Sequence, residues 1–587
     1  MLRRKFIGAI SLCAMLLPTV ALAQAPAAKS IYAAPKEVIA RIKEEGTKRS
    51  QVMDIVRYLS DVNGPRLTGS PGLKRANEWT RDTMAKWGLE NAHLEAWGPF
   101  GRGWTLKRFS AMVDGPTAFP LIAYPKAWTP GTDTLFPAPA VDPKAKASKK
   151  AAAPAAPTST AYTGEVVHFD AKNEAELAQY KGKLKGKIVL VGPIRDLKAH
   201  FAPEATRWTD TQLLDMANAQ DPALIQAPGF NMPRNFGQMM QFNNARMRFL
   251  VDEGAAVLVD AGRGDGGTIF VQQATAVQPP PPAAGEQPRP PARLYDKGTV
   301  VPIQISAAAE QYNRLVRMID AGQKVTMTVD LAVEFQDEDL NNYNTIAELP
   351  GGDLKDQLVM LGGHLDSWQS GTGATDNAAG CAVMMEAVRI LKALDLKPRR
   401  TIRVALWTGE EQGLLGSRAY VKQHFGYRGD GNTPFFGGPN PATLPLTKLP
   451  EYDKLSAYYN IDNGTGKLRG VYLQGNNNVR PIFRTWLEPF SRPTWWKEDF
   501  DPTKDTSYAA NTLTLSNTGG TDHLSFDGIG LPGFQFIQDD VEYGTRTHHS
   551  NMDVYDRIQA DDMKQMAIIV ASFVYQTAMM DEKIPTK

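Results

Sequence analysis

The sequence is poor in cysteine and carries no excess of either charge. Its two cysteines are Cys13, within an N-terminal apolar stretch, and Cys381. If residues 1–23 are removed as an export signal, no intrachain disulfide can form, so an oxidising compartment is tolerated without being exploited. The chain has 65 lysine and arginine residues against 63 aspartate and glutamate residues. This near balance argues against nucleic acid as a partner.

Long apolar runs are also missing, apart from one at the N-terminus. Basic residues 3–5 precede apolar residues 6–22, and residues 21–23 form a small-residue cleavage site. We expect residues 1–23 to be a signal peptide rather than a membrane span, because Pro18 interrupts the run and no second run of membrane length follows. The basic start also resembles a twin-arginine signal. The mature chain is therefore expected to be periplasmic or secreted.

Side chains that suit metal binding follow the ends of apolar, strand-like runs. The first run, residues 358–361, leads through two glycines to His364, with Asp366 two residues further on. Side chains two residues apart in an extended chain share a face, so the carboxylate can hold the second imidazole nitrogen. Alone, such a pair is more often a satisfied polar contact than a metal site, so further ligands are needed to favour a metal.

A carboxylate at the start of a helix supplies one such ligand. Asp376 follows a glycine-containing loop at residues 370–373, and Asn377 is a suitable cap for a helix predicted over Ala378–Leu394. Cys381, in this helix, is predicted to be a small buried packing residue. A strand end and a helix start thus bring a histidine and a carboxylate to one region.

Two further strand-like runs end in acidic residues. The run Thr401–Thr408 is followed by Glu410 and Glu411, which would repel each other if both were buried without a cation. A divalent cation removes that cost, and one glutamate can then bind metal while the other moves protons. The alternative is a solvated acidic turn. The run Leu455–Ile461 ends at Asp462 in the same way.

The fourth element is a histidine pair that follows the predicted strand Gly533–Ile537. His548 and His549 are adjacent, and from an extended segment both cannot point into one crevice. The carboxyl ends of strands in an open α/β sheet line one crevice, so these four strand ends can converge despite their separation in sequence. Of the other histidines, we expect His523 to be a pocket-wall or structural residue.

Six motifs occur along the chain in a fixed order: GGHLDS, GATDNAAG, WTGEEQGLLGS, NIDNGTG, GGTDHLSFDGIGLP and HHSNMD. Together they resemble those of the co-catalytic zinc exopeptidases, a family that includes bacterial leucine aminopeptidases, glutamate carboxypeptidases and carboxypeptidase Q. The overall layout is most similar to the carboxypeptidase Q branch.

The resemblance implies a site with two zinc ions. The implied protein ligands are His364 and Asp462 for one ion, Glu411 and His549 for the other, and Asp376 for both. The family spacing H-S-x-x-D selects His549 over His548. Glu410 is the implied general acid/base, and Asp366 the implied partner of His364. Histidine and carboxylate ligands without thiolate suit a catalytic zinc site with open positions.

The implied function is that of an exported metallo-exopeptidase acting on a peptide or dipeptide, either as an aminopeptidase or as a carboxypeptidase Q-like dipeptidase. Tyr543 and Arg546 are candidates for contacts with an oxyanion or a substrate carboxylate. Two alternatives remain: a non-catalytic receptor or binding protein on the same scaffold, and glutaminyl-cyclase-like amide chemistry. We expect no nucleic acid partner and no membrane association after signal cleavage, and the sequence leaves a homodimer open.

The predicted fold is α/β, with a mixed central sheet flanked by helices and an inserted, mainly β domain. Residues 37–59 show a helical pattern, and the motif GPRLTGSPG at residues 64–72 opens a helix that should stop at Gly88. This motif resembles the opening of the same family. The predicted ranges are 35–135 and 336–580 for the catalytic domain, the latter with the metal site, 136–160 for an Ala/Pro/Lys-rich linker and 161–335 for the insert.

The insert resembles a protease-associated domain through the segments KGKLKGKIVLVGP and EGAAVLVDAG. Strands are predicted over Gly164–Phe169 and Lys187–Gly192, and a helix that turns at Gly254 into a strand over Met247–Val259. Because the insert carries no set of ligand-type residues, we expect it to shape the active-site entrance or to select substrates.

Overall fold

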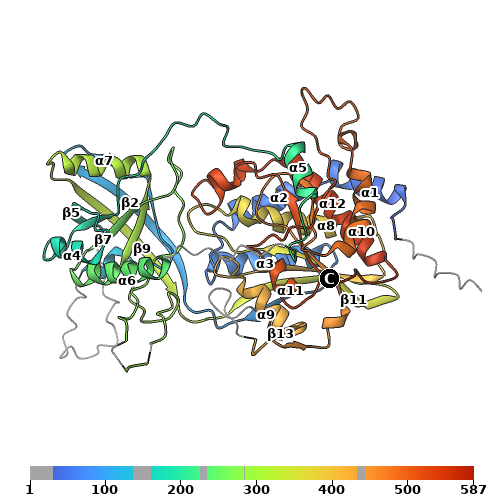
Figure 1. The fold of residues 1–587 in the computed structure, drawn as a ribbon, viewed down its shortest axis with the longest axis horizontal. Coiled ribbons are helices and arrows are strands. Elements are labelled where there is room, and N and C mark those ends of the chain that lie inside the picture. The colour runs from blue at the N-terminus through green and yellow to red at the C-terminus, as the bar shows by residue number, and fades with distance from the viewer. Residues whose placement is uncertain (1–30, 137–159, 225–234, 283–284, 288, 432–442) are drawn as a thin grey trace, which may run out of the picture.

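The computed structural model describes residues 31–136, 160–224, 235–282, 285–287, 289–431 and 443–587. The predicted signal peptide and nearly all of the predicted linker at 136–160 lie outside the described residues. The described chain forms two bodies, each built on an eight-stranded sheet (Figure 1). None of the described helices has the length and apolar character that crossing a bilayer requires.

The sheet of the first body is mixed, in the strand order β1-β10-β12-β11-β15-β18-β16-β17. The four central strands β12, β11, β15 and β18 run parallel. The bounds are β1 Glu90–Trp97, β10 Asn342–Leu349, β11 Leu354–His364, β12 Arg400–Trp407, β15 Leu455–Asn460, β16 Leu468–Tyr472, β17 Thr512–Thr514 and β18 Gly533–Gln538. This mixed α/β arrangement confirms the predicted fold class.

Helices cover both faces of this sheet. The helices and the small β13–β14 hairpin of this body are α1 Lys36–Lys48, α2 Val52–Arg57, α3 Pro71–Lys86, α8 Ala379–Ala393, α9 Leu415–His424, β13 Gly426–Arg428, β14 Leu446–Lys448, α10 Arg480–Leu487, α11 His523–Asp527 and α12 Ala560–Met579. Val359 and Leu361 of β11 join a core with α1, α2, α3, α8, α10 and α12, whereas Leu358 and Met360 join a core with α9 and α11. Burial on both faces explains why the parallel strands read as continuous apolar runs.

The predicted elements of the first body match the structure closely, with one difference. Strands β11, β12, β15 and β18 lie on the four predicted runs, and α8 lies on the predicted helix. The Asn377 side chain accepts the N–H of Gly380 at 2.9 Å, as expected of a cap. The helix predicted over residues 37–59 is instead interrupted between α1 and α2, where Arg49 leaves the helical conformation.

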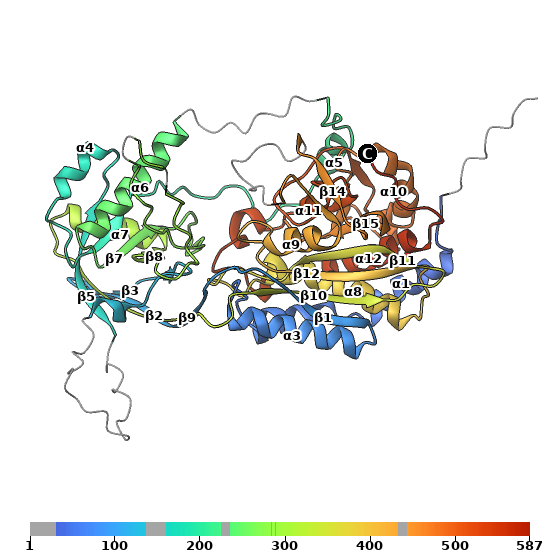
Figure 2. The ribbon, with the colours of Figure 1, turned by 90° about the horizontal axis from the view of Figure 1, so that it is seen from below.

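The sheet of the second body has the order β3-β2-β9-β5-β6-β7-β8-β4 and carries helices α4, α6 and α7 (Figure 2). The bounds are β2 Gly103–Gly115, β3 Phe119–Pro120, β4 Ala123–Pro125, β5 Tyr162–Phe169, α4 Glu174–Leu177, β6 Ile188–Val191, α6 Phe236–Asp252, β7 Val257–Ala261, β8 Ile303–Ala307, α7 Ala309–Asp320 and β9 Thr326–Gln336. Gly254, with φ +74°, lies at the predicted turn between α6 and β7.

The second body begins earlier in the sequence than predicted. The range predicted for the first part of the catalytic domain includes residues 103–125, but β2, β3 and β4 belong to the second sheet. The reason is the long antiparallel pairing of β2 with β9, from Gly103 opposite Gln336 to Gly115 opposite Thr326. A pairing over this separation leaves no local pattern in the sequence.

The chain leaves and re-enters the first body at neighbouring positions. Trp97 of β1 lies opposite Asn342 of β10 in an antiparallel pair. Between them the chain forms the second body, and one segment, residues 206–217, returns to the first body. In this segment α5 (Asp210–Ala217) packs against β17, and Thr206 exchanges two backbone hydrogen bonds of 2.8 Å with Val541. Figure 1 shows α5 on the first body, away from the second sheet.

Candidate active site

The candidate ligands gather at the carboxyl ends of the parallel strands. His364 is the last residue of β11, Glu410 and Glu411 follow β12, and Asp462 follows β15. Asp376 lies in the turn Ala374–Ala378 before α8, where its own backbone is not helical, and His549 follows the turn Tyr543–Thr547 beyond β18. All six side chains line one pocket of about 770 Å³. The strand ends converge as the open α/β sheet predicts.

Asp376 lies between the two histidines and presents one oxygen to each. Its Oδ1 is 3.1 Å from Nε2 of His364, and its Oδ2 is 3.2 Å from Nε2 of His549. Nε2 of His364 is also 3.5 Å from Asp462 Oδ1. Nε2 of His549 is 2.9 Å from Glu411 Oε2. The side chains therefore form two groups that share Asp376.

Glu410 lies beside the His364 group, with its Oε2 4.0 Å from Nε2 of His364. Burial, together with the nearby carboxylates of Asp462 and Asp522, raises the pKa of Glu410 well above its usual value, against the pull of His364. Burial also raises the pKa of Glu411 to about 7. Both glutamates therefore lie where a carboxylate binds a proton more readily than in water.

The pKa values of the histidines and of Asp376 shift through their mutual contacts. Burial would lower the pKa of His549, but Glu411 and Asp376 outweigh it and raise the value to about 10. His364 shifts in the same direction, because Asp462 and Glu410 outweigh its burial. Burial would raise the pKa of Asp376, yet its close contacts with both histidines hold it well below its usual value.

The donor set fits divalent cations. Among the described residues, three groups with ligand atoms within 4.8 Å of one another lie at this site: His364, Asp376 and Glu411; His364, Glu410 and Asp462; Asp376, His548 and His549. A fourth group, His200, Glu204 and Asp265, lies outside the pocket. Asp376 Oδ2 and Glu411 Oε1 are buried and accept no hydrogen bond from the described residues. Buried carboxylate oxygens without a donor are costly, and a cation removes that cost.

Asp366 contacts the site differently from the prediction. Nδ1 of His364 lies 3.0 Å from the backbone oxygen of Asp366 and 3.7 Å from its carboxylate, so the main chain orients the imidazole. The carboxylate accepts the N–H groups of Glu410 and Glu411, both at 3.2 Å, and the hydroxyl of Thr68 at 3.0 Å. Asp366 therefore holds the turn that carries both glutamates.

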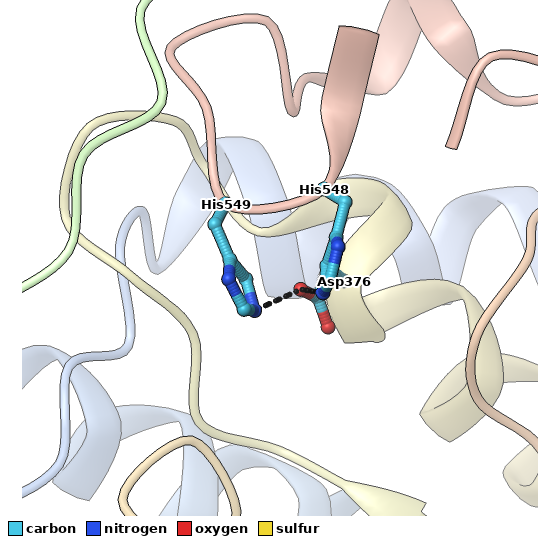
Figure 3. A group of neighbouring side chains, drawn as sticks. All are labelled: Asp376, His548 and His549. Carbon is cyan, nitrogen blue, oxygen red and sulfur yellow. Dashed lines mark ion pairs between the residues drawn. The ribbon is translucent and has the colours of Figure 1, made fainter. Parts of the chain in front are cut away.

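The prediction that adjacent histidines must point apart is wrong. Figure 3 shows both rings directed at Asp376, with His548 Nε2 3.9 Å from its Oδ2. His549 has φ +62°, so the segment is not extended and the alternation of side chains does not apply. The His548 ring stacks on Tyr543, with ring centroids 4.7 Å apart, and burial lowers its pKa.

Two other predicted candidates lie away from the pocket. His523 is fully buried, and its Nε2 lies 2.6 Å from Gln474 Nε2 and 3.2 Å from the backbone oxygen of Thr518, which fits a structural role. Arg546 pairs with Glu204, whereas Tyr543 does line the pocket. Cys381 is buried in the core, as predicted.

Several residues around the site were missed by the sequence analysis. The Arg66 guanidinium is fully buried and donates to five backbone carbonyls, those of Leu59, Gly64, Leu365, Thr372 and Gly373. Trp368 donates its indole N–H to Glu411 Oε2 at 2.7 Å. Arg66 and Thr68 belong to the GPRLTGSPG motif, so a signal existed, but the loop that Arg66 holds lies about 300 residues further along the chain.

The second body also contributes to the pocket wall. Gln273 and Tyr295 line the pocket with the candidate ligands, and the Tyr295 hydroxyl donates to Gln273 Oε1 at 2.6 Å. Tyr295 in turn stacks on Phe100, with ring centroids 4.4 Å apart. No sequence pattern pointed to this pair, because its place at the pocket depends on how the two bodies pack.

Comparisons with known proteins match the part of the chain that carries the candidate ligands. Residues 344–574 match the sequence model of Peptidase family M28. Carboxypeptidase Q of Mus musculus is 28% identical over 279 residues, which are 47% of this chain and 50% of that protein. A probable leucine aminopeptidase 2 of Aspergillus oryzae is 35% identical over 126 residues, which are 22% of this chain and 24% of that protein. This chain thus spans half the length, or less, of these curated relatives.

A solved structure extends the likeness in fold over both bodies. The structure of a Peptidase M28 precursor from Shewanella amazonensis SB2B has a TM-score of 0.58 at 21% identity, and the match covers 94% of this chain and 98% of that one. The segment that carries every candidate ligand, residues 344–574, therefore matches peptidase family M28, and the resemblance drawn from the six motifs is confirmed.

Proposed function

We propose that this chain is a zinc-dependent metallo-exopeptidase that hydrolyses a terminal peptide bond or the bond of a dipeptide. The observation that carries the proposal is the position of Asp376, which offers one carboxylate oxygen to the His364 group and the other to the His549 group. Relatives named carboxypeptidase Q and leucine aminopeptidase support this class of reaction.

The proposed site holds two ions. His364 and Asp462 would complete the ligands of one ion, Glu411 and His549 those of the other, with Asp376 shared. Such cations supply Lewis acidity, polarising the scissile carbonyl and lowering the pKa of a water molecule. Manganese and cobalt suit the same donors, so metal analysis of the protein as isolated identifies the native ion.

Glu410 is the proposed general acid/base. Its carboxylate lies in the pocket, near the His364 group, without being needed as a ligand of either proposed ion. Burial keeps its pKa high, which suits a group that takes a proton from water and returns it to the leaving amine. Trp368 and Asp366 hold Glu411 and the glutamate turn in place while this transfer occurs.

The experiment that tests the proposal is product analysis by mass spectrometry, with one peptide series offered free, N-acetylated and C-amidated to the zinc-loaded mature protein. Loss of cleavage on acetylation alone identifies an aminopeptidase, loss on amidation alone a carboxypeptidase, and loss on both a dipeptidase. Absence of cleavage in all three forms would contradict the proposal and favour a cyclase or a non-catalytic receptor.

We also infer that residues 1–23 direct export to the periplasm or the medium. The basic start, the apolar stretch and the small-residue cleavage site support this inference. Mass measurement of the N-terminal peptide of the protein recovered from periplasmic and cytoplasmic fractions tests it. A chain that keeps residues 1–23 and stays in the cytoplasm would contradict it.

A further inference from the structure

A segment of the second body runs alongside the loop that carries His549. Phe270 and Ser550 form an antiparallel bridge between the two. The N–H of Val271 donates to the backbone oxygen of His549 at 2.9 Å. The loop that carries one candidate ligand is thus hydrogen-bonded at the ligand itself to a different body of the molecule.

Asn551 makes three further hydrogen bonds at this junction. Its backbone N–H donates to the oxygen of Ile269 at 3.1 Å, and its Oδ1 accepts the N–H of Ile269 at 2.7 Å. Its Nδ2 donates to the oxygen of Gly267 at 3.2 Å. One residue, two positions after His549, therefore closes three hydrogen bonds to the second body, and Ile269 is fully buried where they meet.

The conformation of His549 makes this support important. Its φ of +62° is one that L-residues rarely adopt, so the surrounding contacts must hold it. The hydrogen bond from Val271 and the three bonds of Asn551 flank this residue. The direction of the imidazole toward Asp376 and Glu411 follows from that backbone conformation.

The other group of ligands is held within the first body. The ring of His364 is oriented by the backbone oxygen of Asp366, 3.0 Å away. Gln535 of β18 donates to the backbone oxygen of Asp462, and Asn377 donates to that of Ile461 at 2.8 Å. These anchors come from the loop after β11, from β18 and from the turn before α8, all of them in the first body. The two groups that share Asp376 therefore differ in what supports them.

We propose that Asn551 is a positioning residue, through which the metal affinity of the position at Glu411 and His549 depends on contact with the second body. The metal affinity of the position at His364 and Asp462 does not depend on that contact. This inference rests on the proposed function, because it presupposes a site for two ions. It follows that a substitution at this junction should weaken the binding of one ion and leave the binding of the other unchanged.

The test is a cobalt titration of the metal-free, full-length mature protein, followed by visible absorption and by calorimetry. In the Asn551→Ala variant, one equivalent should keep its wild-type affinity while the other binds at least about tenfold more weakly. The Asn551→Asp variant keeps the oxygen that accepts the N–H of Ile269. Its affinity for the weakened equivalent should lie between those of the wild type and Asn551→Ala. It also carries the test if the alanine variant does not fold.

A matched control comes from a different segment, residues 206–217, which contacts the first body separately from residues 267–271. Trp208 donates its indole N–H to the backbone oxygen of Gln538 at 2.7 Å, so Trp208→Phe removes one such bond without touching the His549 loop. This variant should leave both affinities unchanged. Equal weakening of both equivalents in Asn551→Ala, or no weakening, would overturn the inference. A wild-type protein that binds a single equivalent would instead overturn the two-ion proposal, before any variant is compared.

Discussion

The backbone N–H of Glu410 donates to the carboxylate of Asp366, with 3.2 Å between the nitrogen and Oδ1. Since Asp366 also accepts the N–H of Glu411, it fixes the turn that presents both glutamates. The Asp366→Asn variant offers one acceptor oxygen in place of two. We expect it to bind zinc about ten- to a hundredfold more weakly, which is the usual effect of removing a residue that holds a metal-binding side chain in place. Titration with a competing chelator measures this.

Thr68→Val is the matched control for that variant. It removes the hydroxyl that donates to Asp366 Oδ2 at 3.0 Å but leaves both contacts with the glutamate turn. Zinc affinity should change far less than in Asp366→Asn. Equal losses in the two variants would mean that the buried carboxylate needs all of its donors, and that the turn is not its principal partner.

Replacing Glu410 with Gln should remove catalysis without removing metal. The amide has the size of the carboxylate but cannot take up a proton, so kcat should fall by about a hundred- to ten-thousandfold. Elemental analysis should find the wild-type metal content, because Glu410 is not among the proposed metal ligands. Turnover near the wild-type rate would exclude Glu410 from the role of general acid/base.

The Arg66→Met variant should be strongly destabilised. The buried guanidinium donates to five backbone carbonyls, and methionine leaves those carbonyls without their donor in the protein interior. We expect a loss of about 3 kcal/mol or more in the free energy of unfolding. Arg66→Lys keeps the charge but has three donors and no planar fork, so its thermal midpoint should lie between those of the wild type and Arg66→Met.

The contact of His424 with two glutamates predicts a pH-dependent contribution to stability. Nε2 of His424 lies 2.8 Å from Glu95 Oε1, and Nδ1 lies 3.5 Å from Glu451 Oε2. Burial would lower the pKa of His424, but these carboxylates raise it to about 9. Because the pKa is higher in the folded than in the unfolded state, the contribution is complete below about pH 6.5 and is lost as the pH rises through about 9.

Thermal unfolding of the wild type and of His424→Gln, at pH 6 and at pH 9.5, measures that contribution. The wild type should be more stable by about 1 kcal/mol at pH 6. This is well below the free energy that corresponds to the whole pKa shift of His424, because the side chain is partly solvated. The difference should disappear at pH 9.5. A difference that stays constant over this range would show that the imidazole contributes by packing on Tyr420 instead.

The sequence predicted the four strand ends near the candidate ligands because strands buried on both faces give uninterrupted apolar runs. His364, Glu411 and Asp462 follow their runs closely, whereas His549 lies beyond a turn after β18. The pairing of Gly103 with Gln336 could not be predicted in this way, because it joins residues on opposite sides of the whole insert. The direction of the His548 side chain could not be predicted either, since it depends on a backbone angle at His549 that histidine rarely adopts. Gln273 reaches the pocket only through the packing of two bodies.

Because Trp97 pairs with Asn342, β1 and β10 form an antiparallel pair of the first sheet whose connecting loop is the whole second body. Loop-closure entropy rises by only about 0.6 kcal/mol for each doubling of loop length, so the first sheet tolerates so long a loop at modest cost. A tight turn that joins these two residues would close the first sheet equally well. The shortened protein would keep β11, β12, β15 and β18, yet it would leave the His549 loop without the strand-like neighbour that holds it.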